Sequence, residues 1–275
     1  MNQIPVASRK YELVRSLTDK LIDENLSEGF EPLRQVNRSV LSAAFSRTLS
    51  QLEAAMLGQE RERVDGAGGS GPLDYSMNRV LRAVLSFGDV ARSRLGGAME
   101  EVGGTVGSAE KLAAELLWLA QKLTGNGSAE EAVSRWGSAS ILASLSLSAE
   151  PRLQGSLVKI TAFLFKQAKE MGEDECEKEK KEELMQRRME MLMLWLPLLC
   201  RGSNGTDAPV LNRSERMEVE KSLEVNIEML QQEEQQEKVL ALWLHNFSTT
   251  PSSEWPNLHA CYARWCDASR KLLLV

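Results

Sequence analysis

Apolar side chains recur every three or four residues along most of the sequence, the spacing that places them on one face of an α-helix. Over 8–28, Val14, Leu17, Leu21 and Ile22 follow this spacing. The segment 32–57 continues it through Val36, Val40, Leu41, Ala44, Phe45, Leu49, Leu52 and Met56. Gly29 is a typical helix stop between the two. We expect residues 8–57 to form a helical hairpin with a buried face.

The same periodicity predicts most of the remaining chain to be helical. The further helices are expected at 73–95 (with Val80, Leu81, Val84 and Leu85 facing inward), 109–124, from Ser128 onward, 151–171, 170–199, 215–231, 234–247 and from Glu254 onward. No segment has the two-residue alternation of a strand. About ten helices therefore predict an all-α fold, as a multi-helix bundle or an irregular helical array.

Glycine is concentrated in two stretches, 58–72 and 96–107. Residues 58–72 hold five glycines followed by Pro72, a composition typical of a flexible linker. The predicted organisation is an N-terminal helical hairpin at 1–57, a linker at 58–72 and a C-terminal helical domain at 73–275.

Several residues are predicted to begin or end helices. Ser108 and Ser214 are expected N-caps, and Ser128 with Glu131 has the spacing of a capping box. Pro197 is expected to kink or end the helix that contains it, because proline lacks the backbone N–H.

Tryptophan occurs in related contexts. Leu-x-Leu-Trp-Leu is found at 192–196 and 240–244, and Leu-Leu-Trp-Leu at 116–119. Such echoes are consistent with a helical-repeat array. Their unequal spacings favour the other interpretation, in which tryptophan fills the core at several places independently.

Composition narrows the class of protein. The net charge is −6 and the chain has four cysteines in no disulfide-framework spacing. The charge argues against phosphate-driven binding of nucleic acid, and the cysteines favour reduced thiols inside the cell, in the cytoplasm or the nucleus. The longest apolar run, 191–200, is half of what a membrane span needs, about 20 residues.

Residues suited to catalysis or metal binding do not fall into a recognisable pattern. His245, His259, Cys261 and Cys266 are ligand types for zinc, but their spacing would point them in different directions. No nucleophile motif or phosphate-binding loop is present. We therefore predict no catalytic residue, no metal site and no cofactor.

Two charge-rich or methionine-rich segments leave alternatives open. Met185, Met189, Met191 and Met193 suit either a core or an adaptable binding surface. The same region, 184–199, is a minor candidate for a helix lying on a membrane. A helical enzyme of the terpene synthase type would need acidic residues inside a cavity. The only compact acidic segment that could supply them is Glu173-Asp174-Glu175.

Three stretches together resemble the C-terminal helical region of plant BTB/POZ-domain proteins. They are 5–26, 194–224 and 238–274, and the last is the most specific because it carries Trp243, Trp255, Pro256, Tyr262, Trp265 and Arg270 in one ordered run. The BTB domain itself is a mixed α/β domain, and no segment here predicts its strands.

The resemblance implies an adaptor function, because BTB/POZ proteins commonly bring substrates to cullin-based ubiquitin ligases. We therefore expect a non-enzymatic protein-interaction module with a contiguous exposed apolar patch or groove. Trp255, Trp265 and Arg270 are the tentative partner-binding residues, because tryptophan and arginine are enriched at binding hot spots. The alternatives are a helical enzyme with an unrecognised cavity and a scaffold without a ligase connection. The oligomeric state stays open.

Overall fold

The computed structural model describes residues 8–66, 105–171, 178–202, 209–249 and 255–272, and within these ranges the fold is all-helical without a strand. The prediction of an all-α fold is confirmed. The ten helices in the described ranges are α1 (Arg9–Ser27), α2 (Glu31–Gly66), α4 (Thr105–Gly125), α5 (Ala129–Gly137), α6 (Ser140–Ser146), α7 (Pro151–Glu170), α8 (Lys178–Arg201), α9 (Arg213–Glu228), α10 (Glu233–Thr249) and α11 (His259–Leu272). The helix predicted at 73–95 lies outside the described residues.

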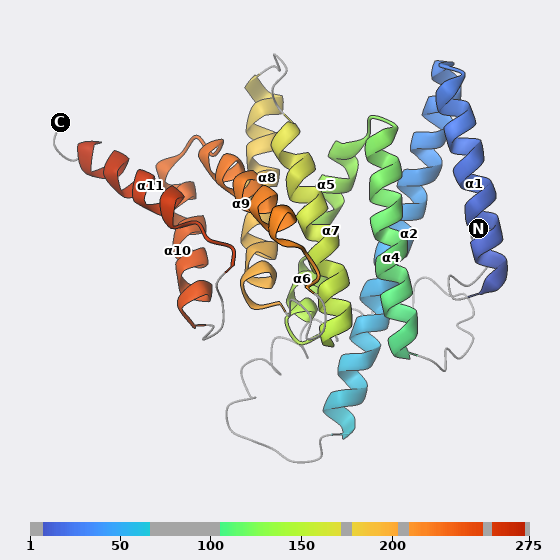
Figure 1. Cartoon of the computed structure of the whole chain (residues 1–275), viewed down its shortest axis with the longest axis horizontal. Coiled ribbons are helices and arrows are strands. Elements are labelled where there is room, and N and C mark those ends of the chain that lie inside the picture. Colours follow the sequence, from blue (N-terminus) through green and yellow to red (C-terminus); the bar gives the residue numbers. More distant parts are fainter. Residues whose placement is uncertain (1–7, 67–104, 172–177, 203–208, 250–254, 273–275) are drawn as a thin grey trace.

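The helices stand side by side and follow one another across the molecule roughly in chain order (Figure 1). The hairpin α1–α2 forms one end, and α10 and α11 form the other. Helix α2 packs on α4, α4 packs on α7, and α8 packs on α10. Among the described helices, those at each end therefore have neighbours on their inner side only.

A continuous hydrophobic cluster runs through the array. It extends from Ile22 and Phe45 at one end to Trp243 and Leu258 at the other. At its centre Trp136 and Trp195 are stacked, with ring centroids 4.2 Å apart. The Trp195 indole N–H donates to the Trp136 carbonyl oxygen at 2.8 Å. Trp195 and Trp243, from the two Leu-x-Leu-Trp-Leu segments, are both fully buried, so both serve as core residues.

Helix α2 is longer than predicted. It continues to Gly66, through the first part of the segment that was expected to be a linker. The glycine at position 58 costs about 1 kcal/mol in a helix, which good helix formers around it can offset. Arg63 in the last turns donates to the Ser148 carbonyl oxygen at 2.6 Å, which ties this extension to the rest of the fold.

The starts of three helices differ from the predicted caps. Asn212, not Ser214, caps α9: its side chain accepts from the Glu215 N–H at 2.9 Å, and the Glu215 carboxylate accepts from the Asn212 N–H at 2.7 Å. Ser128 precedes α5 but its side chain makes no capping hydrogen bond. Glu131 instead accepts a hydrogen bond from the Ser42 hydroxyl at 2.7 Å. Ser108 lies inside α4 rather than at its start.

The long helix predicted over 170–199 corresponds to α8, which begins later than predicted. Helix α7 ends at Glu170 and α8 begins at Lys178. The buried guanidinium of Arg188 on α8 donates to the Ala168 carbonyl oxygen at 2.9 Å, which satisfies an acceptor at the end of α7. Pro197 does not end α8, which continues to Arg201.

Proline also changes the start of the last helix. The sequence places Pro256 in the first turn of a helix that begins near Glu254, but α11 begins at His259. Pro256 lies before it, after a cis peptide bond, and its carbonyl oxygen accepts from the Trp243 indole N–H at 2.8 Å. The bond anchors the approach to α11 on α10.

Candidate functional site

The hairpin α1–α2 carries two apolar stripes on each helix, of which one is buried. The inner stripe consists of Ile22 on α1 and of Leu41, Phe45, Leu52 and Met56 on α2. The second stripe consists of Leu13, Leu17 and Leu21 on α1 and of Val36 and Val40 on α2, and each of these side chains is 55–66% exposed. The prediction of a single inward stripe was therefore wrong for Leu17, Leu21, Val36 and Val40.

The exposed stripe of α1 lies on the side of that helix away from α4's lysine. Lys122 of α4 pairs with Asp19 at 2.6 Å and with Asp23 at 2.9 Å. Residues 17 and 21 stand about half a turn around the helix from these two carboxylates. The stripe therefore faces away from α4, and α2 lies beside it, where Asn37 accepts from the Asn25 amide of α1 at 3.0 Å.

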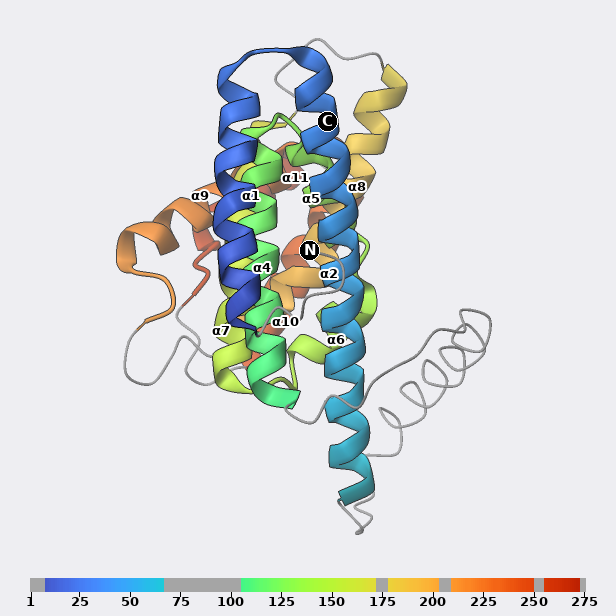
Figure 2. The same cartoon turned by 90° about the vertical axis from the view of Figure 1, so that its right-hand side faces the viewer.

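The exposed stripe of α2 faces away from α5 and from Asn126 for the corresponding reason. Ser42 and Arg38 mark the opposite side of α2, because Ser42 donates to Glu131 of α5 and Arg38 donates to the Asn126 carbonyl oxygen at 2.8 Å. Val36 and Val40 stand about half a turn away from them. The two stripes thus flank the line along which α1 and α2 adjoin, at the end of the array that Figure 2 shows.

We call Leu13, Leu17, Leu21, Val36 and Val40 the hairpin face. Around it, the charged residues of α2 (Arg38, Arg47 and Glu53) are only partly exposed. Its exposed positions between 35 and 54 are all apolar, small or amide-bearing: Gln35, Val36, Ser39, Val40, Ala43, Ser50, Gln51 and Ala54. That span is about 30 Å of helix. Contiguous apolar surface of this kind marks an interaction site on soluble proteins.

A buried polar cluster holds α1 on α4. The Tyr11 hydroxyl donates to the buried carboxylate of Glu115, whose other oxygen lies 3.6 Å from the Arg15 guanidinium. The same guanidinium lies 4.8 Å from the ring centroid of Trp118. Burial raises the pKa of Glu115, although the Tyr11 hydrogen bond and the Arg15 charge both act to lower that pKa. The cluster fixes the rotation of α1 and so keeps the leucine stripe outward.

Comparison with known proteins identifies no relative. No family model matches the chain. The search of curated proteins and the search of solved structures also give no match. The likeness to BTB/POZ helical regions therefore stays a prediction.

The three tentative partner-binding residues lie near the other end of the array and in different environments. Trp255 is half-buried against α9, where its indole N–H lies 3.4 Å from the Arg216 carbonyl oxygen and the Arg216 guanidinium lies 5.7 Å from its ring. Trp265 is half-buried on α11, and its buried indole nitrogen has no acceptor among the described residues. Arg270 is exposed near the end of α11.

Near this end Cys261 is buried and Cys266 is half-buried, whereas His245 and His259 are exposed. His259 lies edge-on to the rings of Trp243 and Phe247, at 5.1 and 5.3 Å. Burial raises the pKa of the Cys261 thiol to about 11 and that of the Cys200 thiol to about 12. Within the described ranges, no group of three or more metal-ligating side chains comes together. Cys176 lies outside them.

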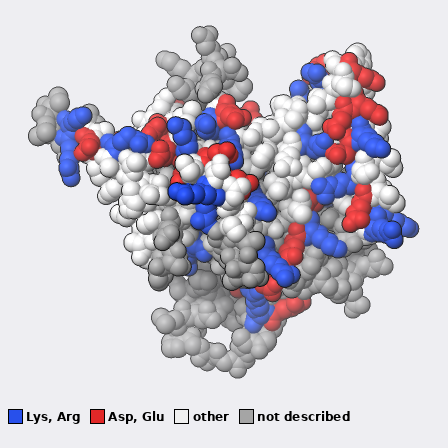
Figure 3. Space-filling model, viewed as in Figure 1, with Lys and Arg blue, Asp and Glu red and all other residues white. Residues whose placement is uncertain are grey.

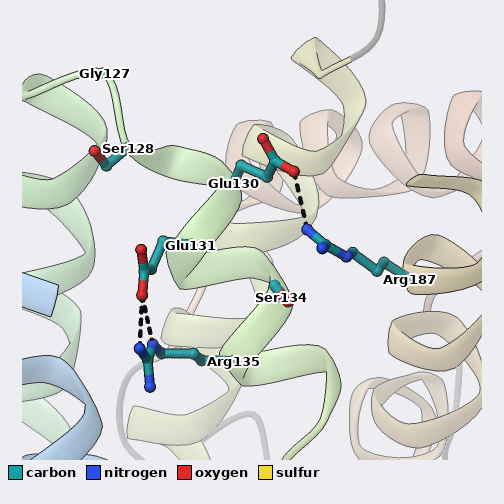
Figure 4. A pocket seen from close by; sticks show the side chains of 7 residues that line it. All are labelled: Gly127, Ser128, Glu130, Glu131, Ser134, Arg135 and Arg187. Atoms are coloured by element: carbon teal, nitrogen blue, oxygen red, sulfur yellow. Dashed lines mark hydrogen bonds and ion pairs between the residues drawn. The ribbon is translucent and has the colours of Figure 1, made fainter. Parts of the chain in front are cut away.

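One polar cavity of about 450 Å³ lies at the start of α5 (Figure 4). Its carboxylates are neutralised by arginines: Glu130 pairs with Arg187 at 2.9 Å, and Glu131 pairs with Arg135 at 2.6 Å. The Arg135 and Ser42 hydrogen bonds lower the pKa of Glu131, which keeps it ionised. The cavity thus contains two closed ion pairs rather than an acid–base pair.

A second cavity, of about 470 Å³, is lined by methionines of α8. Met189 and Met193 contribute to it with Gly137 and Ser138 of α5's end. Met191 is fully buried and Met185 is half-buried, so the methionine segment is divided between core and surface. The membrane alternative for 184–199 is wrong, because Leu192, Trp195 and Leu196 are buried in the core. None of the described helices is long and apolar enough to cross a membrane.

Charge on the remaining surface is mixed. On the side shown in Figure 3, lysine and arginine are interspersed with aspartate and glutamate, without a large area of one sign. Many of these charges are paired between helices, as where Arg264 of α11 meets Glu224 and Glu228 of α9 at 3.2 and 2.8 Å. The hairpin face holds five of the eight large hydrophobic side chains that are exposed in the described ranges.

Proposed function

We propose that this chain is a non-enzymatic protein-interaction module and that the hairpin face is its principal binding surface. The exposure of five branched aliphatic side chains on one face carries the proposal. Exposing them to water is unfavourable by about 25 cal/mol for each Å² of apolar surface. A protein that covers the face recovers this free energy, and the adjoining uncharged surface of α2 adds little desolvation cost.

The rigid attachment of α1 supports a binding function. The Tyr11–Glu115–Arg15 cluster and the Lys122 ion pairs hold α1 at two levels. Contacts that hold α1 in place reduce the entropic cost that a partner has to meet to order this surface. Pre-organisation of this kind is a property of binding surfaces that recognise a defined shape.

The resemblance to BTB/POZ helical regions suggests the finer function. We propose that the module acts inside the cell, in the cytoplasm or the nucleus, as an adaptor that connects substrates to ubiquitin-ligase components. In this proposal the hairpin face makes one contact. The end of the array that holds Trp255, Trp265 and Arg270 makes a second, because tryptophan and arginine there are partly exposed.

Proximity labelling in plant cells tests both contacts. The full chain is compared with Leu17→Lys, with a Trp255→Ala, Arg270→Ala variant and with Met217→Lys as the matched control. Met217 is 61% exposed on α9, outside the hairpin face, so its change adds the same charge elsewhere.

The proposal predicts a set of proteins recovered with the wild type and with Met217→Lys but lost with Leu17→Lys. Cullin or BTB-containing proteins in that set would support the adaptor function. Equal recovery with all four chains would contradict a function for either surface.

A further inference from the structure

The spacing of the exposed side chains along α1 is symmetric about Leu17. Leu17 is at its centre, Leu13 and Leu21 stand four residues to either side, and Lys10 and Glu24 stand seven residues to either side. All five side chains are exposed. The apolar centre is thus bounded by a positive charge at one end and a negative charge at the other.

This arrangement is complementary to a second copy of itself that is related by a two-fold axis. In an antiparallel pair of α1 helices related by a two-fold axis at Leu17, each Leu13 would face Leu21 of the second copy. Each Lys10 would face Glu24 of the second copy, since both lie about 10 Å along the helix from the axis. Two-fold pairing uses the same patch on both subunits, which is the commonest symmetry of homo-oligomers.

From this complementarity we infer that a second copy of the chain covers the hairpin face, with the two α1 helices antiparallel. The inference rests on the proposed function, because it names the first occupant of that surface. Two apolar stripes meet at the centre and two lysine–glutamate pairs close the ends.

Helix α2 is compatible with this pairing. Val36 and Val40 widen the apolar centre beside α1. The adjoining exposed residues Ser39 and Ala43 are small and uncharged, which lets another helix approach α2 closely at these positions. Homodimer interfaces are likewise more apolar than the rest of a protein surface and depleted of charged residues at their centres.

The interface is of modest size. Five aliphatic side chains per subunit with a polar border belong to the lower end of specific interfaces, below about 1,200 Å² in total. We therefore expect a dissociation constant on the order of micromolar.

This equilibrium is measured by sedimentation velocity of the full chain at concentrations from about 1 to 200 µM, which bracket the expected micromolar dissociation constant. We expect Leu17→Lys to weaken the dimer by about a hundredfold, because it places two like charges at the two-fold axis. Met217→Lys should leave the dimer unchanged. Circular dichroism checks that each variant is folded. We expect both to fold because Leu17 and Met217 are exposed.

Charge reversal tests the antiparallel geometry. Lys10→Glu alone and Glu24→Lys alone should each weaken the dimer about tenfold. The double variant should return the dissociation constant to within about threefold of the wild type, since the pairs are re-formed with their signs exchanged. A parallel arrangement would give no such rescue.

The outcomes separate this inference from the proposed function. A wild type that is monomeric throughout the concentration range overturns the second-copy inference, as does a dimer that Leu17→Lys leaves intact. If the wild type is monomeric but the Leu17→Lys variant still fails to label proteins that the wild type labels, the proposed function stands and another protein occupies the face. Dimerisation with the expected variant effects but no labelled protein dependent on the face contradicts the adaptor function alone.

Discussion

The two ends of the helical array differ in how far their apolar residues are buried. At the end formed by α10 and α11, Trp243 is fully buried, with the rings of Phe247 and His259 against it. Its indole N–H is satisfied by Pro256. At the end formed by α1 and α2, five aliphatic side chains remain more than half exposed.

The difference shows that exposed apolar residues at the hairpin end are not simply what the end of an array leaves uncovered. The C-terminal end has the same problem of a missing neighbour, and there the chain covers its aromatic residues with its own α11 and its approach segment. At the hairpin end a second apolar stripe is exposed instead, and the exposed positions beside it on α2 are uncharged. We interpret this as a surface that another protein covers.

Truncating the central side chain of each end should have very different effects on stability. Trp243→Ala removes a fully buried ring and leaves the Pro256 carbonyl without its donor. We expect a loss of about 3–5 kcal/mol in the free energy of unfolding. Leu17→Ala should change it by less than about 0.5 kcal/mol in the monomer. Urea denaturation at low protein concentration, followed by circular dichroism, measures both. Similar losses for the two variants would contradict the comparison.

Within the C-terminal end, Trp255 should contribute less than Trp243. It is half-buried, and its contacts are with Arg216 of α9. Trp255→Ala should therefore destabilise the fold by about 1–2 kcal/mol, and Arg270→Ala, at an exposed position, by less than about 0.5 kcal/mol. The same denaturation experiment checks this order. A loss for Arg270→Ala as large as that for Trp255→Ala would show that the exposed end of α11 is structurally required.

A smaller and local effect is expected from pH at the hairpin end. Because burial raises the folded-state pKa of Glu115 above its usual value of 4.5, the folded protein holds this proton more tightly than the unfolded chain does. The attachment of α1 should thus be strongest below about pH 4.5 and weaken as pH rises through the folded-state pKa.

Hydrogen exchange of the α1 amides, measured against pH and corrected for the intrinsic exchange rate, follows this change. Glu115→Gln keeps an acceptor for Tyr11 but cannot ionise, so its α1 protection should lose the pH dependence. A wild-type protection that rises over the same pH range would contradict the assignment.

Sequence patterns were sufficient for the helices because their period is strong, but not for which side of α1 and α2 is buried. Leu17 and Ile22 belong to the same apolar pattern, and only the tertiary contacts of Tyr11, Asp19 and Asp23 decide that Ile22 faces inward. The hairpin face could therefore be expected as a patch but not located.

Local rules also failed where packing outweighs them. Pro197 removes one helical hydrogen bond, at a cost of about 3 kcal/mol. The burial of Leu196, Leu198 and Leu199 around it offsets that cost, so α8 continues. Asn212 replaces Ser214 as a cap because it forms both bonds of a capping box with Glu215, a pairing that the serine-based prediction did not consider.

The most direct test of the central claim is whether the hairpin face is covered in solution. Hydroxyl-radical footprinting of the wild type at increasing protein concentration measures the reactivity of each side chain. The account predicts that Leu13, Leu17, Leu21, Val36 and Val40 become protected together, while Met217 and Leu244, exposed elsewhere, keep constant reactivity. Reactivity of the face that stays as high as that of the two controls at every concentration would contradict it.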